Sequence, residues 1–370
     1  MKNIKLIIVA AVFFLISAVC WLTPDKEFSQ SERRPLAQKP EINIQNLLSG
    51  QLESDAEKYT ADQFPLREQL RSLKALTEYG LFMKKDNNDI YIQDSHAAKI
   101  LYPYSEKSVS NATSIFGEIY ESFIQDTDSA GNGRIFVSVI PDKGYYLAEE
   151  KGCPHIDYDK LFAQVIEEMD YARYIDLTGT LEADSYYRTD LHWRQEKILP
   201  AAEALGRAMG LELAGLDDLR QITATDSFAG VYKGQSGLPL KAEPLIYLTD
   251  DMIEGCKTFN YETNQEGKVY DLEKLSGRDL YDVFVSGASA LITIENPEAA
   301  KKTNRELIIF RDSFGSSLAP LLLSDYAKIT LVDLRYIKPS YLNQFIDFEG
   351  QDILFIYGTT LLNDSYTIKR

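Results

Sequence analysis

The stretch Glu306-Leu307-Ile308-Ile309-Phe310-Arg311-Asp312-Ser313-Phe314-Gly315 decides the fold. Its first half is a short apolar run, which is typical of a strand buried on both faces of a sheet. A polar turn follows at once, and the pattern of residues 316–326 predicts a helix. A strand, a tight turn that carries a serine and a helix form the arrangement that exposes a hydroxyl at a helix N-terminus.

The C-terminal part of the chain repeats this alternation. Residues 328–334 and 352–357 are predicted strands, and residues 340–348 form a predicted helix between them. Such a βαβαβ run implies a parallel sheet with right-handed crossovers. Polar residues follow three of its strands and should meet at one edge of the sheet: Ser313, Arg335, Thr359 and Thr360.

An earlier strand is predicted at residues 134–140, preceded by a turn at residues 131–133 and ended by Pro141. Lys143 and Tyr145 follow that strand, where open α/β sheets place ligand-contacting loops. They either face the site or belong to a solvated loop.

A second polar stretch, Asp190-Leu191-His192-Trp193, lies far upstream of the serine turn. Asp190 and His192 are two positions apart, so both side chains point the same way in an extended segment. The carboxylate then either holds the imidazole tautomer or takes a separate partner. Taken alone, the histidine reads as a packed neighbour of Trp193. Together with Ser313, the pair completes the inventory of a serine nucleophile activated by histidine and oriented by a carboxylate.

Composition excludes several classes of function. The chain has 370 residues, 45% of them hydrophobic, which is enough for one large domain or two ordinary ones. With 56 acidic against 39 basic residues, its net charge of −17 argues against a nucleic-acid partner. Three histidines and three cysteines give no zinc-site spacing, and Cys153 and Cys256 are the candidates for a disulfide. A glycine fingerprint for nucleotide phosphates is also absent from the sequence.

The N-terminus predicts export from the cytoplasm. Lys2 and Lys5 precede an uncharged run at residues 6–22, which is near the short limit for a membrane-spanning helix. We expect residues 1–23 to be an uncleaved transmembrane signal anchor, with a cleaved secretory signal as the alternative. Residues 24–45 read as a linker, and residues 46–370 as one domain with a small β-rich insertion at about 211–300.

Several of these motifs resemble a known group of proteins. The strand followed by Asp312-Ser313 resembles the SGNH hydrolase superfamily, a three-layer α/β sandwich. The upstream Asp190-x-His192-Trp193 resembles the alginate O-acetyltransferase type and the related DHHW family, in which this block also precedes the serine. Further similarities lie in residues 31–37, 62–67, 281–284 and 333–336. The chain departs from the pattern at Leu191, in place of a histidine, at Arg311, in place of a glycine, and at Ser289, near an expected oxyanion asparagine.

The resemblance implies roles for individual residues. Ser313 would be the nucleophile, His192 the general base, Asp190 its orienting carboxylate and Asp312 an accompanying acid with a structural role. The backbone N–H of Ser313 would be the first oxyanion donor. Further candidates for oxyanion or substrate contacts are Gly287, Ser289, Arg335, Thr359, Thr360, Lys143, Tyr145 and Asp312.

The expected function is that of an extracytoplasmic, membrane-anchored O-acetyltransferase or acetylesterase. Its partners would be a cell-envelope polysaccharide or exopolysaccharide and an acetyl donor supplied by a membrane acyltransferase, and no metal or cofactor is expected. The alternative is a catalytically inactive carbohydrate-binding or assembly protein of the envelope. Intact Asp190, His192 and Ser313 favour the enzyme, because a binding module needs none of the three.

Overall fold

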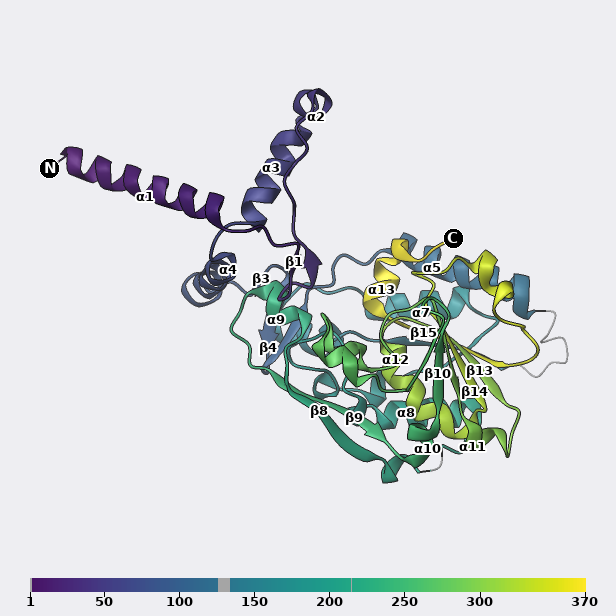
Figure 1. Cartoon of the computed structure of the whole chain (residues 1–370). Helices are drawn as coiled ribbons and strands as arrows, with labels where there is room; N and C mark the ends of the chain where they lie inside the picture. Colours follow the sequence, from purple (N-terminus) through teal and green to yellow (C-terminus); the bar gives the residue numbers. More distant parts are fainter. Residues whose placement is uncertain (1, 126–133, 214) are drawn as a thin grey trace. The chain divides into compact units, whose positions relative to one another are not determined.

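The computed structural model describes residues 2–125, 134–213 and 215–370 (Figure 1). The turn predicted at residues 131–133 lies outside these ranges. The chain divides into two compact units, one of Met1–Ile90 with Val231–Leu240 and one of Tyr91–Gly230 with Lys241–Arg370. The sequence had suggested a single domain from residue 46 onward.

The smaller unit is mainly helical. Its helices are α1 (Lys2–Leu22), α2 (Ile44–Leu48), α3 (Gln51–Asp62), α4 (Arg67–Leu76) and α9 (Val231–Ser236), and its short strands are β1 (Phe28–Ser29), β2 (Arg34–Pro35) and β3 (Asp86–Asn87). Pro65 separates α3 from α4, as its missing N–H predicts. Arg34 binds both carboxylate oxygens of Asp62, at 2.8 and 2.6 Å, and this ties the β1–β2 segment to α3.

The N-terminal segment does form a helix, α1. Within the residues that the structure describes, however, no helix has both the length and the apolar character that crossing a bilayer requires. The predicted transmembrane helix is therefore not supported.

The larger unit is built on an eight-stranded sheet of order β11-β10-β12-β14-β13-β15-β6-β7. Five strands are parallel: β6 (Ile135–Ile140), β7 (Arg173–Tyr174), β13 (Glu306–Arg311), β14 (Lys328–Val332) and β15 (Asp352–Gly358). The predicted βαβαβ run is thus confirmed, with β13 between β14 and β15. Where the sequence predicted helices after the serine and after β14, much of the chain forms 3-10 helices, at Ala319–Asp325 and Pro339–Gln344.

Side chains of this sheet alternate between two cores, which makes the unit a three-layer sandwich (Figure 1). Leu307 and Ile309 of β13 face the core that contains α8 (Leu199–Met209) and α12 (Phe314–Leu318). Ile308 and Phe310 face the opposite core, which contains α5 (Glu106–Ile119) and α7 (Tyr158–Glu168). The short helices α6 (Gly144–Lys151) and α13 (Thr359–Asn363) begin just after β6 and β15.

The region predicted as a separate β-rich insertion is partly built into the main sheet. β8 (Arg220–Phe228) and β9 (Glu243–Thr249) do form an antiparallel pair of their own. In contrast, β10 (Lys257–Asn260), β11 (Gln265–Gly267) and β12 (Leu291–Glu295) extend the large sheet in antiparallel direction beyond β14. Helix α10 (Asp251–Gly255) lies between β9 and β10, and helix α11 (Pro297–Ala300) lies between β12 and β13. The strands β4 (Ile90–Gln93) and β5 (His96–Lys99) are neighbours in a small sheet.

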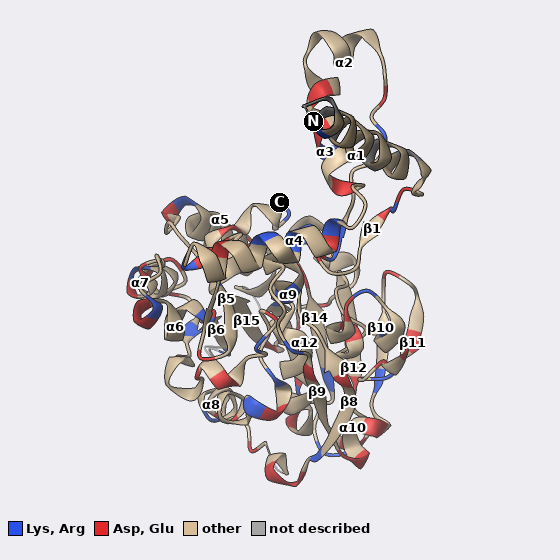
Figure 2. Cartoon of the chain, turned by 90° about the vertical axis from the view of Figure 1, so that its left-hand side faces the viewer, with Lys and Arg blue, Asp and Glu red and all other residues tan. Residues whose placement is uncertain are grey.

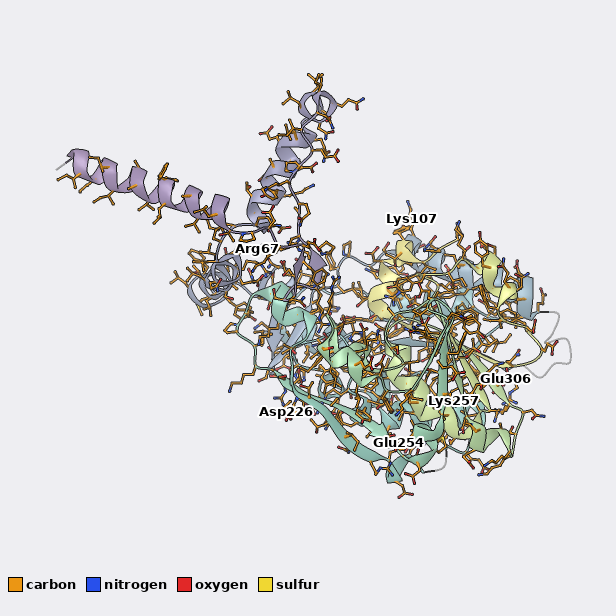
Figure 3. All side chains as sticks on the ribbon, in the orientation of Figure 1. Arg67, Lys107, Asp226, Glu254, Lys257 and Glu306 are labelled. Atoms are coloured by element: carbon orange, nitrogen blue, oxygen red, sulfur yellow. The ribbon has the colours of Figure 1, made fainter. Side chains whose placement is uncertain are left out.

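Many charged side chains of the larger unit lie at its surface. Asp226 and Glu254 project from its outer surface, whereas the space around the sheet is filled by other side chains (Figure 3). Acidic residues are visible on α7 and α10 (Figure 2). This distribution fits the net charge of −17.

Candidate active site

The serine turn follows directly from the local sequence. β13 ends at Arg311, and α12 begins at Phe314, so Ser313 occupies the N-cap position of that helix. Ser313 is half-buried, whereas Asp312 and Phe314 on either side of it are buried. Glycine is required at position 315, because a Cβ there would lie 2.6 Å from the Cβ of Arg311. The turn thus leaves one hydroxyl accessible at the carboxyl edge of the sheet.

The second polar stretch forms the tip of a hairpin-like loop. Tyr186 and Trp193 pair as an isolated antiparallel bridge, and the Tyr187 N–H donates to the His192 carbonyl over 3.0 Å. Gly230 packs against the loop: a Cβ at that position would lie 2.3 Å from the Asp190 Cβ. The tip is therefore closely packed from outside the loop.

The structure brings Asp190, His192 and Ser313 into one hydrogen-bonded chain. His192 Nδ1 donates to Asp190 Oδ1 over 2.6 Å, and the Ser313 hydroxyl lies 2.7 Å from His192 Nε2. An ionised carboxylate only accepts hydrogen bonds, so Nδ1 carries the ring proton and Nε2 of the neutral imidazole is an acceptor. The serine hydroxyl therefore donates to a nitrogen that is free to take its proton.

Solvent exposure increases along this chain from Asp190 to Ser313. Asp190 is fully buried, His192 is 6% exposed, and Ser313 is half-buried. Asp190 Oδ1 also accepts the backbone N–H of His192, at 3.1 Å. The carboxylate thus fixes both the ring and the backbone of the histidine, while solvent reaches the group only at the serine end.

Asp312 has a structural place beside the serine. Its carboxylate accepts the N–H groups of Phe314, at 3.0 Å, and of Gly358, at 2.8 Å. Burial raises its pKa, and the nearby Arg335 guanidinium opposes that shift. These bonds tie the serine turn to the end of β15, as a structural role for this residue requires.

Arg311, which stands where the family pattern has a glycine, is fully buried. Its guanidinium donates to the Gly287 carbonyl over 3.3 Å and lies 3.7 Å from the Asp333 carboxylate. Burial lowers its pKa. The bulky side chain therefore connects the serine turn to the 281–289 loop and to the end of β14.

Most of the predicted oxyanion candidates have other partners. The hydroxyl of Ser289 bonds Asn260 and Glu262, that of Thr359 bonds Asp142, and Arg335 binds both oxygens of Asp333. The Gly287 N–H donates to the Phe284 carbonyl over 3.0 Å, and Thr360 is exposed. The backbone N–H of Ser313, which lies on the residue that carries the hydroxyl, stays the first candidate for an oxyanion donor.

Lys143 and Tyr145 differ in their surroundings. Lys143 is 2% exposed and donates to the Tyr187 carbonyl over 2.8 Å, so it supports the loop that carries His192. Burial lowers its pKa to about 7, against the opposing influence of Asp190, Glu243 and Asp142. Tyr145 is 37% exposed and packs edge-on against Tyr158.

Two residues that sequence reasoning did not select contact His192 or its neighbour Trp193. Tyr281 stacks on the His192 ring, with ring centroids 3.9 Å apart. Ser317 accepts a hydrogen bond from Trp193 Nε1 over 2.7 Å and bonds the Tyr281 hydroxyl over 2.7 Å. Tyr281 lies in the 281–284 motif, which was the available signal, although the apolar content of that motif is typical of a strand.

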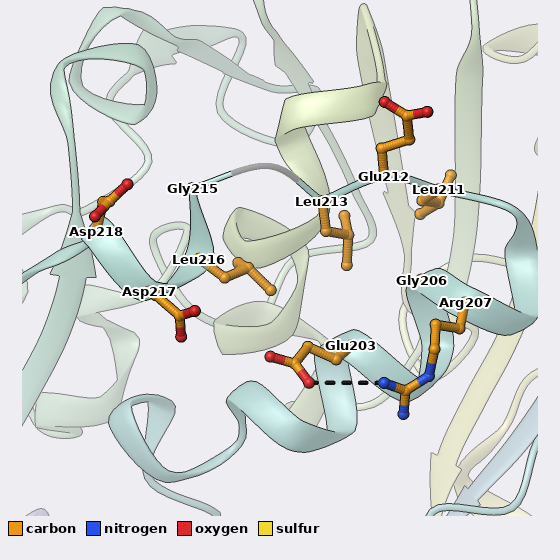
Figure 4. A pocket seen from close by; sticks show the side chains of 10 residues that line it. All are labelled: Glu203, Gly206, Arg207, Leu211, Glu212, Leu213, Gly215, Leu216, Asp217 and Asp218. Carbon is orange, nitrogen blue, oxygen red and sulfur yellow. Dashed lines mark ion pairs between the residues drawn. The ribbon is translucent and has the colours of Figure 1, made fainter.

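Other features of the larger unit lie apart from the triad. In the described ranges, no group of three or more His, Cys, Asp or Glu side chains is placed to hold a metal ion. Cys256 is a free buried thiol, so it forms no disulfide with Cys153. A hollow of about 320 Å³ lies beside α8, where Glu203 and Arg207 form an ion pair at 3.8 Å (Figure 4). Its lining contains no member of the triad.

Comparison with solved structures identifies the fold. A DHHW family protein from Eubacterium siraeum matches with a TM-score of 0.58 and 19% identity, over 75% of this chain and 93% of that one. The chain has the fold of this DHHW family protein. Bacillus cereus PatB1, solved with a sulfonyl adduct, matches with a TM-score of 0.58 and 16% identity, over 76% and 100% of the two chains.

The O-acetyltransferase domain of Pseudomonas putida AlgJ matches with a TM-score of 0.45 and 13% identity, over 74% of this chain and 92% of that one. No protein-family model and no curated protein sequence matches the chain. The resemblance to the DHHW family that the sequence suggested is confirmed at the level of the fold.

Proposed function

We propose that this protein is an acyl-ester enzyme in which Ser313 is the nucleophile, His192 the general base and Asp190 the orienting carboxylate. The observation that carries the proposal is the continuous chain of hydrogen bonds, 2.6 Å from Asp190 to His192 and 2.7 Å from His192 to Ser313. Both distances are short enough for direct proton transfer in the resting arrangement.

The reaction begins when His192 Nε2 takes the proton of Ser313 as Oγ attacks the ester carbonyl. The tetrahedral intermediate carries its negative charge on the former carbonyl oxygen, which the Ser313 backbone N–H faces. The protonated imidazole, stabilised by Asp190, then gives its proton to the leaving alkoxide. An acyl-serine and a free alcohol result, and the same base activates the acceptor hydroxyl or water that removes the acyl group.

We take the acyl group to be acetyl and the acceptor to be a hydroxyl of a cell-envelope polysaccharide or exopolysaccharide. The sequence motifs shared with the alginate O-acetyltransferase type support this substrate class, and a membrane acyltransferase would supply the acetyl donor. We place the activity outside the cytoplasm, with residues 1–23 as the export segment, because two lysines precede a long uncharged run there. Cell fractionation tests the location: recovery of the protein in the cytosol would contradict it.

The chemistry is tested by acetyl release from a chromogenic acetyl ester, with the full chain and three variants. Ser313→Ala and His192→Ala should each lose at least about a thousandfold in kcat/KM. Ser316→Ala is the matched control, since this serine lies in the helix that follows Ser313 but is buried, and the hydroxyl that bonds His192 Nε2 is that of Ser313; the variant should retain activity. Equal rates in all variants would refute the assignment.

A sulfonyl fluoride provides an independent probe of the nucleophile. It should add one sulfonyl group to the intact protein, located on Ser313 by peptide mass spectrometry, and His192→Ala should slow the labelling.

Adding a polysaccharide acceptor should divert acetyl from water to sugar. Retention of the polysaccharide without labelling would instead favour the inactive carbohydrate-binding protein.

A further inference from the structure

The His192 imidazole is covered on one face by an aromatic ring. Tyr281 lies parallel to it, with ring centroids 3.9 Å apart and an angle of 6° between the planes. Phe314 meets the same imidazole edge-on at 5.5 Å. These two contacts leave the ring little freedom to rotate about its side-chain bonds, and the parallel contact is the closer one.

Tyr281 is itself held from several sides. It lies in a three-residue-per-turn helix, Leu280–Val283, whose N-cap Asp279 accepts the Tyr281 N–H over 2.9 Å. Its hydroxyl bonds Ser317, and its ring packs against Phe284 at 4.8 Å. Tyr281 is only 3% exposed. The stacked geometry is therefore fixed by the loop and does not depend on a bound ligand.

The backbone after Tyr281 is shaped to present this ring. Val285, Ser286 and Gly287 have consecutive positive φ angles of 53°, 56° and 82°. Left-handed conformations are unfavourable for a β-branched residue, and they persist where the surroundings enforce them. The Gly287 carbonyl is held by Arg311, so the loop is attached to the serine turn at its far end. One short segment thus contacts both the base and the block that carries the nucleophile.

The charged groups that act on Tyr281 are the carboxylates of Asp190, Asp279 and Asp312. Of these, Asp190 bonds the imidazole directly. Lys143, which interacts with Asp190, is the cation on the loop side. The open face of an aromatic ring carries partial negative charge and attracts a cation placed over it. A positive charge that develops on the imidazole during the reaction would therefore lie over the Tyr281 ring.

We propose that Tyr281 is a positioning residue of the triad: its ring fixes the plane of the His192 imidazole and stabilises the imidazolium that forms when Ser313 is deprotonated. The tyrosine makes no contact with the reacting atoms in this role. This inference rests on the proposed function only for its catalytic consequence, since the stacking can be measured on the protein without a substrate.

The test separates the shape of the ring from its charge distribution. Tyr281→Phe keeps the stacked ring and loses only the hydroxyl. Pentafluorophenylalanine at position 281 keeps the shape and reverses the ring's charge distribution. Tyr281→Leu removes the ring. Tyr326→Leu is the matched control, because Tyr326 is fully buried and its hydroxyl bonds Asp352, not the triad.

The readout is the pH titration of the histidine ring signals by NMR of the full chain. The chain has only three histidines, and His192→Gln assigns the signal. With pentafluorophenylalanine, the His192 midpoint should fall by about 0.5 to 1.5 pH units relative to Tyr281→Phe. Tyr281→Leu should shift it in the same direction, and Tyr326→Leu should leave it unchanged. Identical midpoints in the phenylalanine and pentafluorophenylalanine proteins would overturn the proposal.

Kinetics provide the second readout. Tyr281→Leu should lower kcat with KM nearly unchanged, and the acid limb of the pH profile should move as the NMR midpoint does. A wild-type protein without acyl-transfer activity would refute the proposed function, yet the titration would still decide the role of the ring. If Tyr281→Leu does not fold, the comparison of the two aromatic variants remains sufficient.

Discussion

Asp190→Asn is the sharpest perturbation that the site offers. Asp190 Oδ1 accepts both the ring Nδ1–H, at 2.6 Å, and the backbone N–H of His192, at 3.1 Å. An amide oxygen in the same place can accept both bonds. In either orientation of the amide the negative charge is lost, and with its NH2 toward Nδ1 the amide also shifts the ring proton to Nε2. The substitution therefore tests what the carboxylate contributes to the activity of His192.

The size of the effect follows from this geometry. Two unit charges about 4 Å apart interact by about 4 kcal/mol at the effective dielectric constant that fits protein sites. This attraction exists only once the imidazole is charged, so it lowers the barrier rather than the ground state. At about 1.4 kcal/mol per decade, its loss corresponds to a decrease of about a thousandfold in kcat/KM.

The assay is steady-state acetyl release from a chromogenic ester, with Asp142→Asn as the matched control. Asp142 is a half-buried aspartate at the carboxyl edge of the sheet, where Thr359 and Tyr158 donate to one oxygen and the Gly144 N–H to the other. Its amide would point an NH2 group at a donor, so we expect a loss of about 1–3 kcal/mol in stability. Its activity should stay within about threefold of wild type.

Two results would refute this reasoning. Asp190→Asn with more than a tenth of the wild-type kcat/KM would show that the carboxylate charge does not stabilise the transition state. Equal activity losses in Asp190→Asn and Asp142→Asn would show that both act through the general stability of the sheet edge. Thermal denaturation of each variant determines which fraction is folded.

Three further predictions concern single positions. The pKa of Lys143 is lowered to about 7, so the folded protein releases this proton at a lower pH than the unfolded chain does. The free energy of unfolding of the wild type should therefore rise from pH 7 to 9 relative to that of Lys143→Met, by up to about 1.4 kcal/mol per pH unit. If urea denaturation gives the same pH dependence for both proteins, the prediction is wrong. Gly230→Ala should lose activity and about 1–3 kcal/mol of stability, because its Cβ would lie 2.3 Å from a backbone oxygen. Gly179→Ala is the control and should be neutral, because no atom lies within 4 Å of the added Cβ. Equal melting temperatures of the two variants would exclude the clash. Gly287→Ala should destabilise more than Gly350→Ala in calorimetry, because both have positive φ but only Gly287 would place a Cβ 2.2 Å from a carboxylate; equal losses would mean that φ strain alone decides.

The sequence was most informative where apolar runs alternate with turns. The strands β13, β14 and β15 and the serine turn were predicted at nearly their observed positions, because a buried parallel strand is a continuous apolar run with clear ends. Asp190 and His192 were expected on one side of an extended segment; the structure shows the two in contact, but at the tip of a turn rather than in an extended segment.

Pairing and local capping were harder to predict. Residues 281–285 have the apolar and β-branched content of a strand, but the Asp279 cap and the positive φ of Val285 turn them into a tight helical turn and a left-handed loop. The apolar run at residues 291–294 is typical of a strand and coincides with β12, but a sequence does not say which sheet an antiparallel strand joins.

The oxyanion candidates show a different limit. Their position at strand ends is visible in the sequence, but the partners of their side chains are not. The Ser289 hydroxyl donates to Glu262 and the Thr359 hydroxyl to Asp142, and both acceptors are remote in sequence. Tyr281 was missed for the same reason, because stacking on His192 depends on a contact across 89 positions.

The hydrogen bond between His192 and Ser313 joins positions 121 residues apart. Contacts of such long range form only after the intervening chain has been ordered, since closing the loop costs entropy before any packing compensates for it. A nascent or partly assembled chain therefore carries an inert serine, and reactivity appears only with the finished sheet. The rate at which a sulfonyl fluoride labels the refolding protein would then measure how fast the last stage of folding is completed.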